Sequence, residues 1–136
     1  MKTIDRVFSC LLFLGGVGHT LGCFAAYGSK PELLLWSLSA SLFLFLLAAL
    51  NFVRAGRSGD RTLGWITLIF NPCQFVAAIQ FGRVIQNLLD PRVIGFCLIT
   101  LVLTAMSMRS INLAARPRER TEYACHSASD QDPCAD

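Results

Sequence analysis

The sequence predicts an all-α polytopic membrane protein, an antiparallel bundle of four transmembrane helices with a disordered C-terminal tail. Hydrophobic residues make up 54% of the 136-residue chain and charged residues only 15%, whereas an ordinary soluble domain carries about 25% charge. A bilayer core needs about 20 consecutive apolar residues per helix, more than a buried helix of a soluble domain needs. Such stretches without Asp, Glu, Lys or Arg occur at residues 7–29, 33–53, 62–82 and 93–108. This pattern excludes a soluble enzyme, a nucleic-acid binder and a disulfide-stapled secreted domain as first interpretations.

Each uncharged stretch predicts one helix. The fourth stretch is short, but the side chain of Arg109 can reach the interface and lengthen the span. The links contain turn-forming Gly, Pro and Asp residues, and links this short make consecutive helices antiparallel neighbours. We place the spans at about residues 7–27, 33–53, 63–83 and 93–111.

The chain divides into a transmembrane domain, residues 1–115, and a tail, residues 116–136. The tail is rich in Arg, Glu, Ser, Asp and Pro, a composition that cannot pack a core. We therefore expect it to be disordered. The five residues that begin the tail, Arg-Pro-Arg-Glu-Arg, suit contact with anionic lipid.

Lys and Arg are distributed unevenly between the two sides of the predicted bundle. Nine of the twelve lie on the side of the N-terminus, residues 54–62 and the tail; the other side holds Lys30, Arg83 and Arg92. The positive-inside rule places the basic side in the cytoplasm. We therefore expect a multi-pass protein of a bacterial inner membrane with both termini cytoplasmic.

An alternative concerns the first span. Basic residues, an apolar stretch and Thr20-Leu21-Gly22-Cys23 resemble a bacterial lipoprotein signal. Cleavage there would leave a lipidated Cys23 and three spans. His19 interrupts the apolar stretch and the expected Leu three residues before the cysteine is absent, so the four-span interpretation is preferred.

Small residues form a ridge along the first span at helical spacing: Gly15, Gly18, Gly22 and Ala26. Such ridges let helix backbones approach closely in lipid, where no hydrophobic force drives association. The ridge predicts packing within the bundle, and the alternative is a face for a homo-oligomer or another membrane protein.

Polar side chains inside the spans predict a layer near the membrane midplane. At about 1.5 Å per residue, His19 and Ser41 lie roughly 18 Å from the cytoplasmic side, Gln74 about 16 Å and Thr100 about 20 Å. Asn71 lies somewhat lower, at about 12 Å. We predict that these five side chains, on four helices, form a binding site that faces inward, because lipid offers polar groups no partner.

His19 is the centre of this predicted site. A charged imidazolium at that depth is costly, so we expect a neutral ring that needs both a hydrogen-bond donor and an acceptor. The histidine could bind a ligand, relay protons, hold a haem or only fix helix register. Next to Asn71, Pro72 removes one backbone donor, which predicts a kink in the third span.

Six cysteines are present without a Cys-x-x-Cys motif, which argues against a thiol oxidoreductase. Cys23 and Cys97 share a depth, so a disulfide between them is one option and two small buried side chains the other. Cys125, His126 and Cys134 lack the spacing and the fourth ligand of a zinc site. We therefore expect no metal, no cofactor and no catalytic constellation.

These observations predict a small inner-membrane protein without catalytic machinery, an accessory or structural protein that binds a small lipid-like ligand around His19. Membrane lipid is the expected partner, with a second copy or another membrane protein as a further one. The alternatives are a small-solute transporter or pore subunit, and an enzyme or redox protein that acts on a lipid or quinone through His19. The spans contain no acidic residue for proton or cation coupling, which argues against small multidrug exporters.

Overall fold

A computed structural model of the protein describes residues 2–57 and 59–115, and helices are the only regular secondary structure in this part of the chain. All four of its helices are long and apolar enough to cross a membrane. The predicted fold class, a multi-pass four-helix membrane bundle, is confirmed. The helices are α1 (Lys2–Tyr27), α2 (Pro31–Gly56), α3 (Arg61–Val84) and α4 (Pro91–Ala114). The tail, residues 116–136, with its predicted disorder, basic cluster, Cys125, His126 and Cys134, lies outside the described residues.

The helices extend beyond the predicted spans, mostly at one end of the bundle. α1 begins at Lys2 rather than near residue 7, and α2 continues to Gly56 rather than ending near residue 53. Asp5 and Arg54 therefore belong to helices, although the sequence assigned them to the polar flanks.

The helix boundaries follow from local chemistry. Pro31 opens α2 and Pro91 opens α4, where a missing N–H costs nothing because the first turn has no acceptor for it. The carboxylate of Asp60 caps α3 by accepting from the backbone N–H groups of Thr62 and Leu63, at 3.0 and 3.1 Å. α3 ends where Gln86 adopts a left-handed φ of 54°, a conformation that a continuing helix does not allow.

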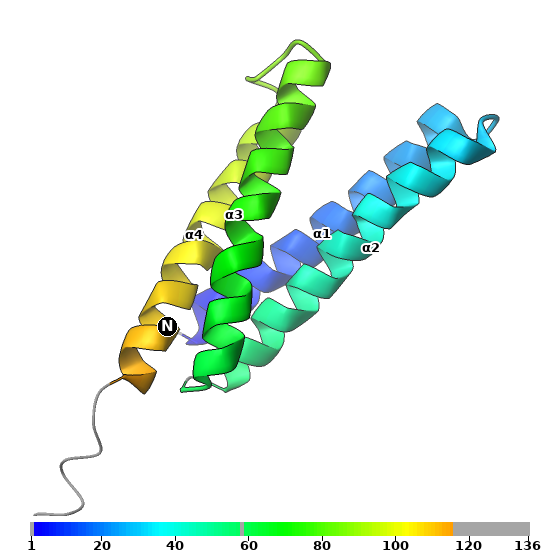
Figure 1. The fold of residues 1–136 in the computed structure, drawn as a ribbon. Coiled ribbons are helices and arrows are strands. Elements are labelled where there is room, and N and C mark those ends of the chain that lie inside the picture. Colours follow the sequence, from blue (N-terminus) through cyan, green and yellow to red (C-terminus); the bar gives the residue numbers. More distant parts are fainter. Residues whose placement is uncertain (1, 58, 116–136) are drawn as a thin grey trace, which may run out of the picture.

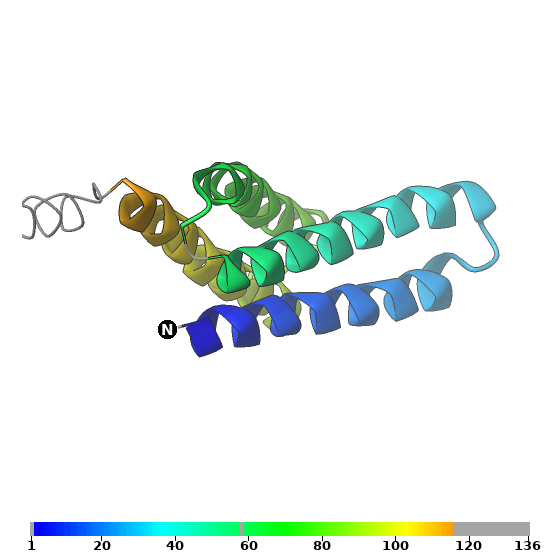
Figure 2. The same ribbon diagram turned by 90° about the horizontal axis from the view of Figure 1, so that it is seen from below.

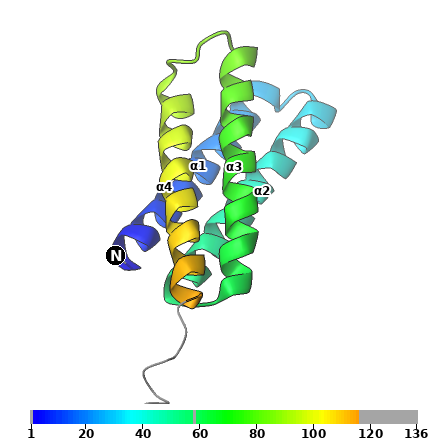
Figure 3. The same cartoon turned by 60° about the vertical axis from the view of Figure 1, so that its left-hand side comes forward.

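The helices form two antiparallel hairpins, α1–α2 and α3–α4, which cross and diverge (Figure 1). Viewed from below and from the side, each hairpin stays together as a pair while the two pairs run at an angle to each other (Figures 2 and 3). We call the end where α1 begins, α2 meets α3 and α4 finishes the Arg54 end. The opposite end, with residues 28–30 and 85–90, is the open end, because the hairpins lie farther apart there (Figure 1).

A small apolar core joins the hairpins next to the Arg54 end. Leu12, Leu44, Leu47, Ala48 and Leu103 are each at most 2% exposed and pack together. Many other large apolar side chains face outward, for example Leu35 and Leu98 at 70% and 57% exposure. An outward apolar surface and a thin interior are what a bundle surrounded by lipid requires.

Candidate functional site

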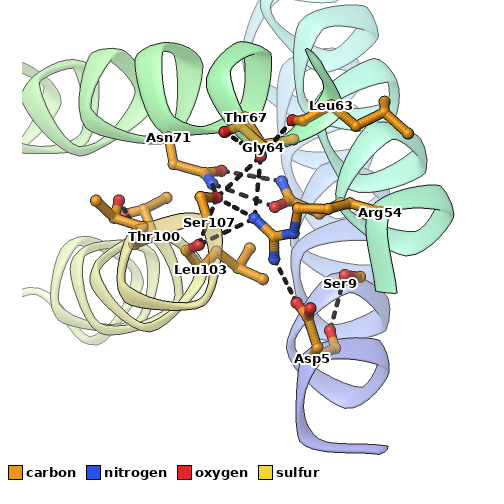
Figure 4. Close-up of polar contacts among 12 residues, drawn as sticks. Asp5, Ser9, Arg54, Leu63, Gly64, Thr67, Asn71, Thr100, Leu103 and Ser107 are labelled. Carbon is orange, nitrogen blue, oxygen red and sulfur yellow. Dashed lines mark hydrogen bonds and ion pairs between the residues drawn. The ribbon is translucent and has the colours of Figure 1, made fainter. Parts of the chain in front are cut away.

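Arg54 forms the centre of a buried polar cluster at the Arg54 end (Figure 4). Its guanidinium is 1% exposed and donates from Nη2 to the carboxylate of Asp5 on α1, at 2.5 Å. Its Nη1 donates to Thr67 Oγ1 on α3 at 3.0 Å, to the backbone oxygen of Leu103 on α4 at 3.2 Å and to Ser107 Oγ. One side chain thus connects all four helices.

Amide and hydroxyl groups complete this cluster. Asn51 and Asn71 donate to each other's amide oxygens at 2.9 and 3.2 Å, across the two hairpins. Asn71 also donates to Ser107 Oγ at 3.3 Å, and Ser107 donates to Thr67 at 2.9 Å. We call this set the Arg54 network: Asp5, Asn51, Arg54, Thr67, Asn71 and Ser107. It holds the hairpins together at one end only.

A cavity of about 1070 Å³ lies between the hairpins on the other side of the apolar core. We call it the inter-hairpin cleft. Its wall is mainly apolar and includes Phe43, Phe81, Phe96 and Ile99, and its polar members include His19 and Gln74. Small-molecule sites usually measure about 300–1,000 Å³ and combine an apolar lining with a few polar groups, so the cleft has the size and composition of a ligand site.

His19 presents one face to the cleft and the other to its own hairpin. Its Nδ1 lies 3.0 Å from Ser41 Oγ and 3.2 Å from Cys23 Sγ. Ser41 and Cys23 are 2% and 5% exposed, and Ser41 is outside the cleft lining. Ser41 therefore lies behind the imidazole and positions it, while Nε2 has no protein partner among the described residues.

Gln74 reaches the cleft from the second hairpin. It is 9% exposed, and its amide makes no hydrogen bond to any described residue. The amide is not one of the fully buried polar atoms that lack a partner among the described residues, so it is open to the cleft. An unpaired amide in the cleft wall marks the place where a ligand or water would bind.

The structure divides the predicted polar layer into two places. His19 and Ser41 meet, and Gln74 lines the same cleft, as the depth calculation suggests. Asn71 instead belongs to the Arg54 network, one helical turn nearer that end. Thr100 is fully buried, but its hydroxyl donates to the Phe96 backbone oxygen of its own helix at 2.7 Å.

The glycine ridge of α1 also divides. A Cβ on Gly15 would meet the Phe96 ring at 2.8 Å, so this glycine permits close packing of α1 on α4. Gly18 and Gly22 would meet nothing within 4 Å; with Ala26 they line the cleft. Bundle packing therefore accounts for Gly15, and the rest of the ridge forms open cleft wall.

The structure also gives the positions of the remaining predicted features. α3 continues as one helix through Pro72. Cys23 and Cys97 are both free thiols, and Cys97 is half-buried. Within residues 2–57 and 59–115, no three His, Cys, Asp or Glu side chains gather in a way that could hold a metal ion.

The Arg54 network was not predicted from the sequence, because Arg54 was counted as a loop charge and Asp5 and Asn51 were left unused. A signal was present: Ala48, Asn51 and Arg54 follow one another at steps of three, which places them along one side of a helix. Continuing the inward face of the second span past residue 53 would have identified Arg54 as an interior residue.

Comparisons with known proteins give no family for this chain. No family model matches it, and no curated protein and no solved structure is significantly similar to it. Its function is therefore inferred from the geometry of the cleft.

Proposed function

We propose that this protein is an accessory membrane protein that binds a lipid-like ligand in the inter-hairpin cleft. The observation that carries the proposal is the cleft itself, an apolar cavity of about 1070 Å³ with His19 on one hairpin and an unpaired Gln74 on the other. An apolar body would pack on the phenylalanine rings, and a polar group would satisfy the two side chains. Ligand sites in helical membrane bundles are built in this way from inward-facing side chains.

The charge asymmetry supports a bacterial inner membrane with both termini in the cytoplasm. In that orientation the Arg54 end faces the cytoplasm and the open end faces outward. The cleft would then be reached from the outer leaflet, where a membrane-dissolved ligand can enter between the hairpins without crossing water.

The surroundings of His19 favour binding over catalysis. A serine nucleophile must face its substrate and its base together. Ser41 contacts His19 but lies outside the cleft lining, so its hydroxyl orients the ring and is shielded from the cleft. The imidazole is left with Nε2 as a single ligand contact.

Filling the cleft tests the proposal. Gly22→Leu adds a side chain to the cleft wall where a Cβ meets nothing within 4 Å, so the bundle should keep its melting temperature while bound lipid-like molecules are lost. Native mass spectrometry of protein extracted in a mild detergent measures the co-purified ligand. Gly56→Leu is the matched control, because it adds the same side chain at a helix position that is also open but outside the cleft.

Two results would contradict the proposal. One is equal ligand retention by the wild type, Gly22→Leu and Gly56→Leu. The other is wild-type protein that carries no ligand and takes up none from added lipid extract.

A further inference from the structure

We infer that the cleft ligand is an uncharged amphiphile whose polar group is a hydrogen-bond-accepting oxygen of the carbonyl type, held by His19 and Gln74. This inference rests on the proposed function and names the class of ligand. The cleft wall leaves hydrogen-bond donors unpaired and offers an ionic group no counter-charge beside His19.

The tautomer of His19 follows from its buried neighbours. Among the described residues, the hydroxyl of Ser41 and the thiol of Cys23 have only His19 Nδ1 within reach as an acceptor. A buried hydroxyl must donate somewhere, so Nδ1 is the accepting nitrogen. A neutral imidazole carries its proton on the other nitrogen, and Nε2–H is therefore a donor for the cleft.

Gln74 adds to the donors. Its amide has two N–H donors and one acceptor oxygen, and all of them lack partners in the described part of the chain. His19 and Gln74 thus offer three donor hydrogens and one acceptor atom. The hydroxyls of Ser37 and Tyr27, which also line the cleft, both donate and accept. Ser39 adds one acceptor, because its hydroxyl already donates to the Trp36 backbone oxygen, and donors remain in excess. A ligand that accepts hydrogen bonds but donates few would pair with the unpaired donors of this wall. A carbonyl oxygen accepts hydrogen bonds and donates none.

The charges of the wall argue against an ionic head group beside His19. Arg92 is the one charged residue among the lining residues of the described chain. Its guanidinium donates twice to the carboxylate of Asp90, at 2.9 and 2.8 Å, so the pair is neutral as a unit. Neither a cation nor an anion would find a counter-charge beside His19, and burial of an unpaired charge is costly.

Dodecanophenone and dodecylbenzene provide the test, because they differ only in a carbonyl group that replaces a methylene. Binding is measured by equilibrium dialysis against protein in phosphatidylcholine nanodiscs, with partition into empty nanodiscs subtracted. We expect the ketone to bind about tenfold more tightly, which corresponds to about 1.4 kcal/mol, and its C=O stretching band to shift to lower wavenumber on binding. Dodecanoate and dodecylammonium should bind more weakly than the ketone.

Variants of His19 and Gln74 test which side chains donate hydrogen bonds to the ligand. His19→Phe and Gln74→Leu should each reduce the preference for the ketone while dodecylbenzene still binds. His19→Gln restores a terminal N–H donor and should recover part of the preference. Thr100→Val is the matched control, since Thr100 is a fully buried polar residue outside the cleft lining, and it should leave the preference unchanged. Circular dichroism and gel filtration check that each variant is folded.

The outcomes separate the two proposals. If neither neutral compound binds to the wild type, the proposed function is wrong. If both bind equally, or if a charged analogue binds best, the cleft takes a ligand but the inference about its chemistry is wrong. A ketone preference that persists in either His19→Phe or Gln74→Leu overturns the assignment of the donors.

Discussion

Arg54 connects all four helices through the hydrogen bonds of one side chain. A fully buried guanidinium is stable only with a counter-charge and with partners for its remaining N–H groups. Asp5 supplies the charge and accepts from Nη2, and two hydroxyls and a backbone oxygen accept from Nη1, while Nε is buried without a partner among the described residues. The charge pair lies within the first hairpin, whereas the neutral acceptors belong to the second. The ion pair therefore stabilises the first hairpin, and the neutral hydrogen bonds join the two hairpins.

Removal of the guanidinium tests this role. Arg54→Met leaves the Asp5 carboxylate unpaired, and loss of one partner of a buried pair costs about 3–5 kcal/mol. We expect a large loss of stability in chemical unfolding in mixed micelles. The double variant Asp5→Leu, Arg54→Met removes both charges and should recover much of that loss. A single variant as stable as the wild type would contradict the assignment of the ion pair.

At the scale of elements, each hairpin is defined by how its helices start and how closely they pack. Gly64 lets α3 approach α4, because a Cβ there would lie 2.7 Å from Ile111 Cγ1. Gly16 does the same for α1 on α2, where Phe45 lies 3.0 Å from the position of a Cβ. Small residues at the contacts, rather than large apolar ones, bring membrane helices together.

The cap of α4 predicts a pH dependence. The side chain of Arg92, followed by its backbone N–H, hydrogen-bonds to the Asp90 carboxylate and lowers the pKa of Asp90 to about 2. A lowered pKa in the folded state adds stability above the ordinary value of about 3.9, and this stability is lost as the pH falls through 2. The carboxyl ¹³C shift of Asp90 should titrate with a midpoint near 2, and in Arg92→Gln the midpoint should rise towards 3.9. An unchanged midpoint in that variant would contradict the pairing.

The elements themselves could be predicted from the sequence, because long uncharged stretches leave few alternatives in a bilayer. Their ends could not, because Asp5 and Arg54 carry charges that usually mark a loop, and only their pairing across 49 positions allows them inside. The level of His19 and Ser41 could be calculated from helical rise alone. Whether Asn71 and Thr100 reach the cleft depends on the angle at which the hairpins cross, and no local sequence pattern encodes that angle.

For the whole molecule, the decisive property is that the hairpins are joined at one end and separate at the other (Figure 1). The apolar core and the Arg54 network lie at the joined end, and the inter-hairpin cleft lies at the other. Bundle helices normally pack along their full length. The divergence leaves Gly18 and Gly22 without neighbours and leaves Gln74 without a hydrogen bond.

This asymmetry predicts a gradient of local stability. Opening needs less free energy where fewer buried contacts are lost, so backbone amides of α1 and α3 beside the cleft should exchange faster than those near Leu12 and Asn71. Hydrogen–deuterium exchange with mass spectrometry in detergent micelles measures this difference. Uniform protection along both helices, or faster exchange near Leu12, would contradict it.

The ion pair also has a consequence for biogenesis. Asp5 and Arg54 both belong to α1–α2, so Arg54 has its counter-charge as soon as the first hairpin has been synthesised, before α3 exists. The hairpin can therefore enter the bilayer with its buried charge already neutralised by its own chain. The second hairpin, which contributes only neutral acceptors to the Arg54 guanidinium, docks afterwards. The chain order of the helices thus sets the order of events. Asp5 neutralises the charge of Arg54 first, and the second hairpin encloses it afterwards.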